Sequence, residues 1–143
     1  MNNWIIPSNS SKFDLAKFLS KHNNYVDWKQ SANFEVGDVV YIYCTKPEMR
    51  IRYKMEVVGI NTPFSKSLKD ENCWTDKAEF KAGIANNKYF RMKVLCRTNS
   101  PMLTMAELHK HGVEGWIQSP RTLSKDVINY IEDAFKQIEI SIY

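Results

Sequence analysis

The stretch from Phe34 to Gly59 constrains the fold of this 143-residue chain most tightly. It begins with a turn at Gly37, a residue type that adopts positive φ angles without strain. Val39 to Thr45 is then apolar or β-branched at nearly every position, which predicts a strand buried on both faces. After a turn at 46–49, apolar and charged residues alternate from Arg50 to Val57, which predicts a half-buried return strand. We therefore expect an antiparallel hairpin whose first strand is central in a sheet.

The segments before and after this hairpin predict smaller elements. Residues 3–6 form an apolar strand, which we expect to end at Pro7 because proline has no N–H for strand pairing. A helix follows, beginning in the polar loop 8–11 and ending near Lys21. Residues 25–33 are mostly polar and predict a loop. Residues 61–85 predict a long irregular loop with one short helix at 74–80, and residues 88–97 predict another strand.

The C-terminal third contains clear helix signals. Thr104 and Glu107 have the spacing of a capping box, for a short helix that ends at Gly112. A short strand is expected at 116–118, with Trp116 in the core. Ser124 is placed to cap a last helix. The alternation in residues 138–143 is compatible with an edge strand.

These elements together predict one domain spanning residues 1–143 with an α+β fold, a curved and mostly antiparallel sheet or barrel carrying peripheral helices. A chain of this length buries roughly two-thirds of its unfolded surface, so it folds without a disulfide or a metal. Cys44, Cys73 and Cys96 are odd in number and lack C-x-x-C spacing, which argues against a disulfide scaffold and favours a cytoplasmic location. No apolar run reaches the roughly 20 residues of a membrane helix.

Charge and motifs narrow the classes of function. The formal net charge of +4 is compatible with a polyanionic partner, although many proteins without one are equally basic. The sequence has no P-loop, no GxGxxG run, and neither GxSxG nor HExxH. His109 and His111 lack the spacing of metal ligands. We therefore expect neither a cofactor nor a metal, and a binding module in preference to an enzyme.

Three patterns, in this order and at these distances, resemble the EVE domain, a member of the PUA-like fold. They are the strand 4–6 with Pro7-Ser8-Asn9, the segment VGDVVYIY at 36–43, and the run 119–124 leading into a helix. The resemblance implies a PUA-like pseudobarrel, similar to YTH domains, with a pocket for a flipped or single-stranded base. It also implies a modified DNA or RNA as partner and a nuclease that can act alongside. The loop 29–33 is shorter than in the family, so the identity of the ligand does not carry over from it. The oligomeric state also stays open.

The resemblance also implies a set of candidate site residues. Trp28 matches the position of the pocket tryptophan, where base stacking on an aromatic ring contributes about 1–3 kcal/mol. We expect Tyr43 or Trp74 to assist in stacking. The residues expected to read base edges are Ser8, Asn9, Gln30 and Ser31, and those expected to contact phosphate are Lys29, Arg50, Arg52, Lys54 and Arg121.

Two alternatives remain from the sequence. Alternating charges at Arg50, Arg52 and Lys54 are most often a solvated strand face, and basic residues also discourage edge pairing. ASCH domains share the PUA-like fold, and some are similar in using lysine, threonine and glutamate for hydrolysis of amides or RNA. Lys54 and Glu56 project from the same face of one strand, as that chemistry would need. A protein-interaction module that uses residues 61–85 is the second alternative.

Overall fold

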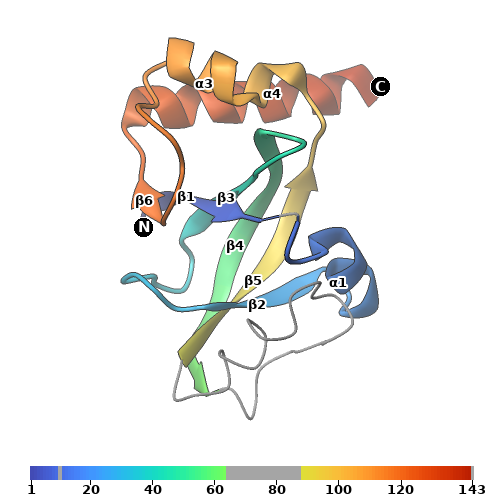
Figure 1. Ribbon diagram of the computed structural model, residues 1–143, viewed down its shortest axis with the longest axis vertical. Helices are drawn as coiled ribbons and strands as arrows, with labels where there is room; N and C mark the ends of the chain where they lie inside the picture. Colours follow the sequence, from blue (N-terminus) through green and yellow to red (C-terminus); the bar gives the residue numbers. More distant parts are fainter. Residues whose placement is uncertain (10, 64–87, 143) are drawn as a thin grey trace.

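A computed structural model describes residues 1–9, 11–63 and 88–142 of the chain (Figure 1). The described strands form one open mixed sheet in the order β2-β5-β4-β3-β1-β6, which confirms the predicted α+β class. The strands are β1 (Asn3–Ser8), β2 (Tyr25–Lys29), β3 (Val39–Cys44), β4 (Arg50–Pro63), β5 (Lys88–Arg97) and β6 (Arg121–Thr122). The helices of the described part are α1 (Leu15–Lys21), the 3-10 helix η3 (Pro101–Leu103), α3 (Met105–Lys110) and α4 (Lys125–Ile142).

The predicted hairpin is confirmed as β3 and β4. The two strands pair antiparallel, and β1 lies parallel on the other side of β3, so β3 is central as expected. All residues of β3 after Val39 are buried. A register shift leaves Arg52 between the pairs Ile42–Tyr53 and Tyr43–Ile51, so the hairpin contains a bulge.

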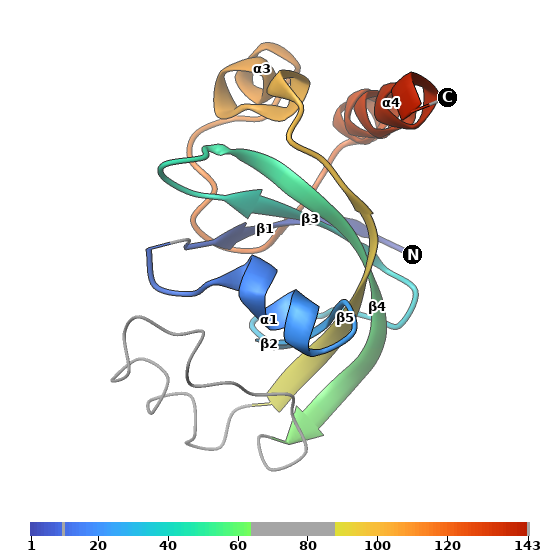
Figure 2. The ribbon, with the colours of Figure 1, turned by 90° about the vertical axis from the view of Figure 1, so that its right-hand side faces the viewer.

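Figure 2 shows α1 on one side of the sheet and α3 with α4 on the other, and a hydrophobic core lies between the sheet and the helices on each side. Alternate residues of β3 supply both, because successive side chains of a strand point to opposite faces. Val40 and Ile42 pack with Phe18 of α1 in the first core. Tyr41 packs in the second, under α3 and α4.

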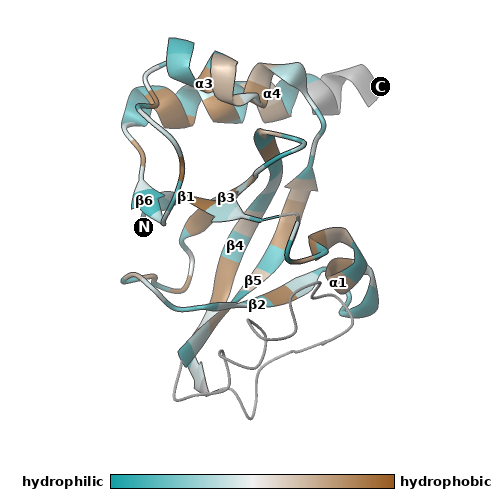
Figure 3. Cartoon of the chain, viewed as in Figure 1, coloured by the Kyte–Doolittle hydropathy of each residue, from teal (hydrophilic) through white to brown (hydrophobic). Residues whose placement is uncertain are grey.

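Helix α4 covers the second core through an amphipathic pattern. Val127, Ile131, Ala134 and Phe135 recur at helical spacing and are all buried. Apolar and polar segments accordingly alternate along the ribbon of α4 (Figure 3). The helix begins beside the predicted cap Ser124, whose hydroxyl accepts a hydrogen bond from the Val127 N–H at 3.4 Å. It continues to Ile142, so the edge strand expected at 138–143 is wrong.

The predicted end of the first strand and the predicted start of the first helix are also wrong. β1 runs through Pro7 to Ser8. Within the described sheet Pro7 pairs with β3 alone, because β6 reaches only Trp4 and Ile5, and a strand with one open side tolerates proline. α1 begins at Leu15, later than expected, because Asp14 is its N-cap and accepts from the Lys17 N–H at 3.0 Å. The predicted end at Lys21 is confirmed.

Residues 25–33 do not form the predicted loop throughout. Residues Tyr25–Lys29 form strand β2, which pairs antiparallel with β5 at one edge of the described sheet. Val26 is fully buried against this sheet, which stabilises the strand despite its polar neighbours. Residues 116–118, expected as a strand, have no strand structure, and the last strand is instead β6.

None of the described helices combines the length and the apolar character that crossing a bilayer requires.

Candidate functional site

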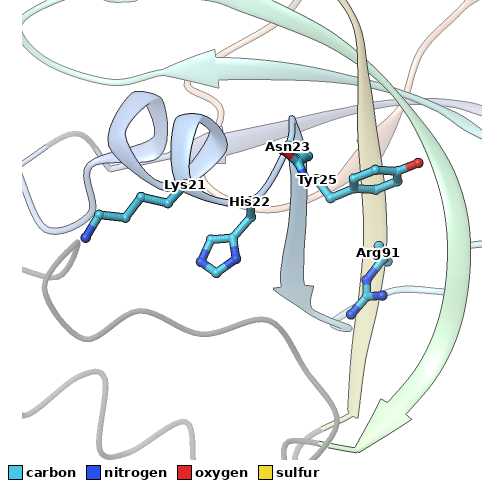
Figure 4. A pocket seen from close by; sticks show the side chains of 5 residues that line it. All are labelled: Lys21, His22, Asn23, Tyr25 and Arg91. Carbon is cyan, nitrogen blue, oxygen red and sulfur yellow. The ribbon is translucent and has the colours of Figure 1, made fainter.

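A hollow of about 320 Å³ opens between the C-terminal end of α1 and the β2–β5 ribbon (Figure 4). Its lining consists of Lys21, His22, Asn23, Tyr25 and Arg91. All five side chains carry polar groups, and three of them are of basic residue types. The hollow therefore combines hydrogen-bond donors with the aromatic rings of His22 and Tyr25.

The chain reaches this hollow through the C-terminal cap of α1. The His22 N–H donates to the carbonyls of Phe18 and Leu19. Asn23 and Asn24 then have φ angles of 55° and 68°, in the left-handed region that asparagine tolerates better than most residues. The chain thereby reverses within two residues, so the helix end and the start of β2 line the same hollow.

Arg91 is held in place from behind by Asp27. The Asp27 carboxylate, whose side chain is 0% exposed, accepts from Arg91 Nε at 2.7 Å and from Nη2 at 3.0 Å. This bidentate ion pair fixes the plane of the guanidinium group. The hydrogen bonds from Arg91 to Asp27 also raise the pKa of the guanidinium, which stays charged. Arg91 therefore presents a rigid, permanently protonated donor group at the hollow.

His22 and Tyr25 provide the aromatic side of the hollow. The His22 ring packs on Phe18 with a centroid distance of 4.2 Å. Its Nε2 atom is buried and has no hydrogen-bond partner in the described part of the chain. The Lys93 ammonium lies 5.9 Å from the centre of the Tyr25 ring, within cation–π range. A buried nitrogen without a partner is unusual in proteins, and binding of a ligand beside it is one way to satisfy it.

The structure places Trp28 on β2 and not in a loop. Its indole is half-buried and meets Phe13 edge-on, with ring centroids 5.6 Å apart at 81°. It packs against the core under α1 and is not part of the hollow's lining. Trp28 thus has one edge in the core and part of its surface in solvent.

The expected base-edge residues have other contacts. The Gln30 amide donates to Asn61 Oδ1 at 3.3 Å and accepts from the Asn61 N–H at 3.0 Å. Ser8 is buried at the end of β1. The Asn9 side chain accepts from the N–H and the hydroxyl of Ser11, which makes a local turn.

Of the predicted stacking residues, the two that the structure describes, Trp28 and Tyr43, are not brought together. Tyr43 is buried in the core under α3 and α4, whereas Trp28 packs against the core on the opposite face of the sheet. Burial raises the pKa of Tyr43. Trp74 lies outside the described residues, as do the helix expected at 74–80 and Cys73. Lys29 and Ser31 are exposed near the end of β2.

Two of the predicted phosphate contacts instead tie loops to the sheet. Arg50 donates to the carbonyls of Glu48 and Asn99. Arg52 donates to the Thr98 carbonyl at 2.7 Å and forms a 2.5 Å ion pair with Glu48. Because these guanidinium groups have protein acceptors, a phosphate would have to compete with those contacts.

Lys54 and Arg121 are likewise engaged. Lys54 Nζ lies 2.5 Å from Glu132 of α4, and the same carboxylate accepts from the Tyr41 hydroxyl at 2.8 Å. Glu132, and not the expected Glu56, is therefore the carboxylate paired with Lys54. Burial and the bond to Glu132 raise the pKa of Tyr41, which stays protonated. Arg121 Nη2 donates to the Glu114 carbonyl at 2.8 Å.

Trp116 is not in the core as predicted. Its side chain is 62% exposed, and its ring meets His109 edge-on at 6.0 Å. The His109 Nε2 atom lies 2.7 Å from the Gly115 carbonyl, which anchors this loop. No group of three or more His, Cys, Asp or Glu side chains in the described residues is placed to hold a metal ion.

Sequence reasoning missed the lining of the hollow. Lys21, His22 and Asn23 read as an ordinary helix end, and Arg91 as one charge in a strand. The polar run 21–24 directly after an apolar helix face was the available signal. Asp27 and Arg91 are 64 residues apart in sequence, so their pairing is visible only in the folded chain.

Comparison with known proteins identifies the fold. No model of a known protein family matches the sequence. No curated protein matches it either. Among solved structures, ASCH from Zymomonas mobilis is similar at 14% identity with a TM-score of 0.62, covering 92% of this chain and 94% of its own.

Two further solved structures have the same arrangement. Protein Atu2648 from Agrobacterium tumefaciens has 13% identity and a TM-score of 0.64, covering 93% of this chain and 92% of its own. Rpa0253 from Rhodopseudomonas palustris has 13% identity and a TM-score of 0.61, covering 96% and 94%. At such identities the likeness concerns the fold alone. The chain has the PUA-like fold of the ASCH domain.

Proposed function

We propose that this chain is a nucleic-acid-binding module that takes a single strand of RNA or DNA along the β2–β5 ribbon. The observation that carries the proposal is the hollow, which combines an Arg91 guanidinium fixed by Asp27 with the Tyr25 ring. Single-strand binding sites have this composition, because cations hold phosphates and aromatic rings stack on bases. The finer proposal is an EVE-type module whose half-buried Trp28 reads a modified base.

Neighbouring side chains extend the basic surface around the hollow. Lys93 faces Tyr25 across the β2–β5 pair. Lys29 and Lys88 are exposed at the other end of the same two strands. Positive groups spread along one ribbon match the spaced negative charges of a single strand.

Fluorescence anisotropy with a labelled single-stranded oligonucleotide tests the proposal. We expect binding that weakens with salt, with a log–log slope of about −2 if three phosphates are neutralised. An unmodified and a base-methylated oligonucleotide of one sequence should be compared on the wild type and on Trp28→Ala. Trp28→Ala is expected to lose any preference for the methylated strand while keeping the salt-dependent part of the affinity.

The outcomes separate the two levels of the proposal. If neither the unmodified nor the methylated oligonucleotide shows salt-dependent binding, the nucleic-acid function is contradicted. Equal discrimination by both proteins removes Trp28 from base reading and leaves the general function intact. Circular dichroism must show that Trp28→Ala is folded, because this indole also packs on Phe13.

A hydrolase is the second candidate. It is favoured by the cluster of Lys54, Glu132 and Tyr41, which places an ammonium, a carboxylate and a phenol together. The Lys54 and Glu132 side chains are 22% and 29% exposed, so solvent reaches both. Incubation with RNA and with acylated nucleosides decides it: turnover that disappears in Lys54→Met supports a hydrolase, and no turnover ends this candidate.

A further inference from the structure

We infer that the hollow beside α1 receives a phosphorylated end of the nucleic acid strand, that is, a terminal nucleotide carrying a phosphomonoester. The inference rests on the proposed nucleic-acid function and specifies which part of the strand binds there. Three features carry it: the size of the hollow, the number of donors around it, and the wall made by the end of α1.

The size of the hollow suits one nucleotide. A volume of about 320 Å³ is at the small end of the range for small-molecule sites. The turn at His22 and Asn23 closes one side, where the chain passes from α1 into β2. A strand that entered past Tyr25 would therefore meet the helix end, so the nucleotide in the hollow is the last one.

The donors suit a phosphomonoester better than an internal phosphodiester. A monoester has three terminal oxygens and a charge of about −1.5 to −2 at neutral pH, whereas an internal phosphate has two such oxygens and one charge. Arg91, Asn23 and Lys21 line the hollow from different elements or turns, and each carries hydrogen-bond donors. His22 also lines the hollow, and its buried Nε2 atom has no hydrogen-bond partner among the described residues, so a phosphate that displaced its neighbours would give it one. Tyr25 supplies the ring on which the terminal base stacks.

The test compares three versions of one short oligonucleotide by fluorescence anisotropy: hydroxyl at both ends, 5′-phosphate and 3′-phosphate. The label is attached to an internal base, so both ends are free. We expect one phosphorylated version to bind about tenfold or more tightly than the hydroxyl version, because charge-assisted hydrogen bonds replace contacts with water. A nucleoside monophosphate should compete for the site, and the matching nucleoside should compete more weakly.

Two substitutions locate the effect without disturbing the fold. Lys21→Gln removes an exposed ammonium, and His22→Phe keeps a ring to pack on Phe18 while removing Nε2. Both are expected to reduce the advantage of the phosphorylated end to about threefold or less. The matched controls are Lys17→Gln, an exposed lysine of the same helix, and His111→Phe, a ring that stacks on Tyr130 at 3.6 Å. Both controls should keep the full advantage.

The results distinguish this inference from the proposed function. If all three versions of the oligonucleotide bind with equal, salt-dependent affinity, the terminal-phosphate site is overturned and nucleic-acid binding is supported. A phosphate advantage that survives in Lys21→Gln and His22→Phe places the site elsewhere and also overturns the inference. Failure of every oligonucleotide and of the monophosphate to bind contradicts both.

Discussion

Replacing Asp38 with alanine is expected to lower the free energy of unfolding by about 3–5 kcal/mol. Asp38 is the acidic residue of the VGD turn and is fully buried. Its carboxylate accepts from the Asn2 N–H at 2.9 Å, the Trp4 indole at 2.9 Å and the Glu35 N–H at 3.0 Å. The alanine variant leaves these donors unpaired and loosens β1 from the hairpin. Urea unfolding followed by tryptophan fluorescence measures the change.

The effect should depend on pH in a defined direction. Burial alone would raise the pKa of Asp38, but the hydrogen bonds from Asn2, Trp4 and Glu35 outweigh it and lower the pKa below its usual value. A lowered pKa means that the stabilisation is present above the unfolded-state value, near 3.9, and is lost as the pH falls through the folded-state value. The difference in the free energy of unfolding between wild type and Asp38→Ala should therefore become smaller below about pH 4. Asp133→Ala, at an exposed position of α4, is the control. A difference in the free energy of unfolding that is the same at all pH values contradicts this account.

Replacing Arg91 with methionine is expected to destabilise the fold by about 3 kcal/mol and to weaken oligonucleotide binding about tenfold or more. The first effect arises because the Asp27 carboxylate stays buried after its two hydrogen bonds from Arg91 are lost. The second arises because the hollow loses its fixed cation. Chemical unfolding measures the first effect and anisotropy the second.

A double variant separates these two effects. Asp27→Asn with Arg91→Met replaces the buried charge by a neutral amide, so stability should return in part while binding stays weak. Lys93→Met removes a charge from the same strand outside the hollow and should lower affinity by less. Recovery of full binding in the double variant would show that Arg91 acts only by stabilising the sheet.

The central hairpin and the last helix could be predicted because their signals are local. Burial on both faces of β3 follows from an uninterrupted apolar run, and α4 follows from apolar residues at helical spacing after Ser124. Strand β2 was missed because its sequence, Tyr25–Lys29, is half polar. Its structure depends on pairing with β5, which is more than sixty residues further along the chain.

The candidate site was less predictable than the fold. Arg50, Arg52 and Lys54 alternate with apolar residues along a strand. The sequence pattern is the same whether their charged groups face solvent or form hydrogen bonds within the protein. Here each has a protein acceptor, such as Glu132 for Lys54, supplied by a distant element. Trp116 is expected in the core, yet the loop that carries it leaves the indole largely exposed. Whether a side chain can contact a ligand therefore depends on the contacts that it makes in the folded protein.

An NMR titration of amide shifts with the end-phosphorylated single strand tests the central claim most directly. We predict the largest changes in the segment 21–25 and at Arg91, the two parts of the chain that line the hollow, and changes that weaken as salt is added. Changes confined to α3, α4 and the loop around Trp116, or none at saturating oligonucleotide, would contradict it.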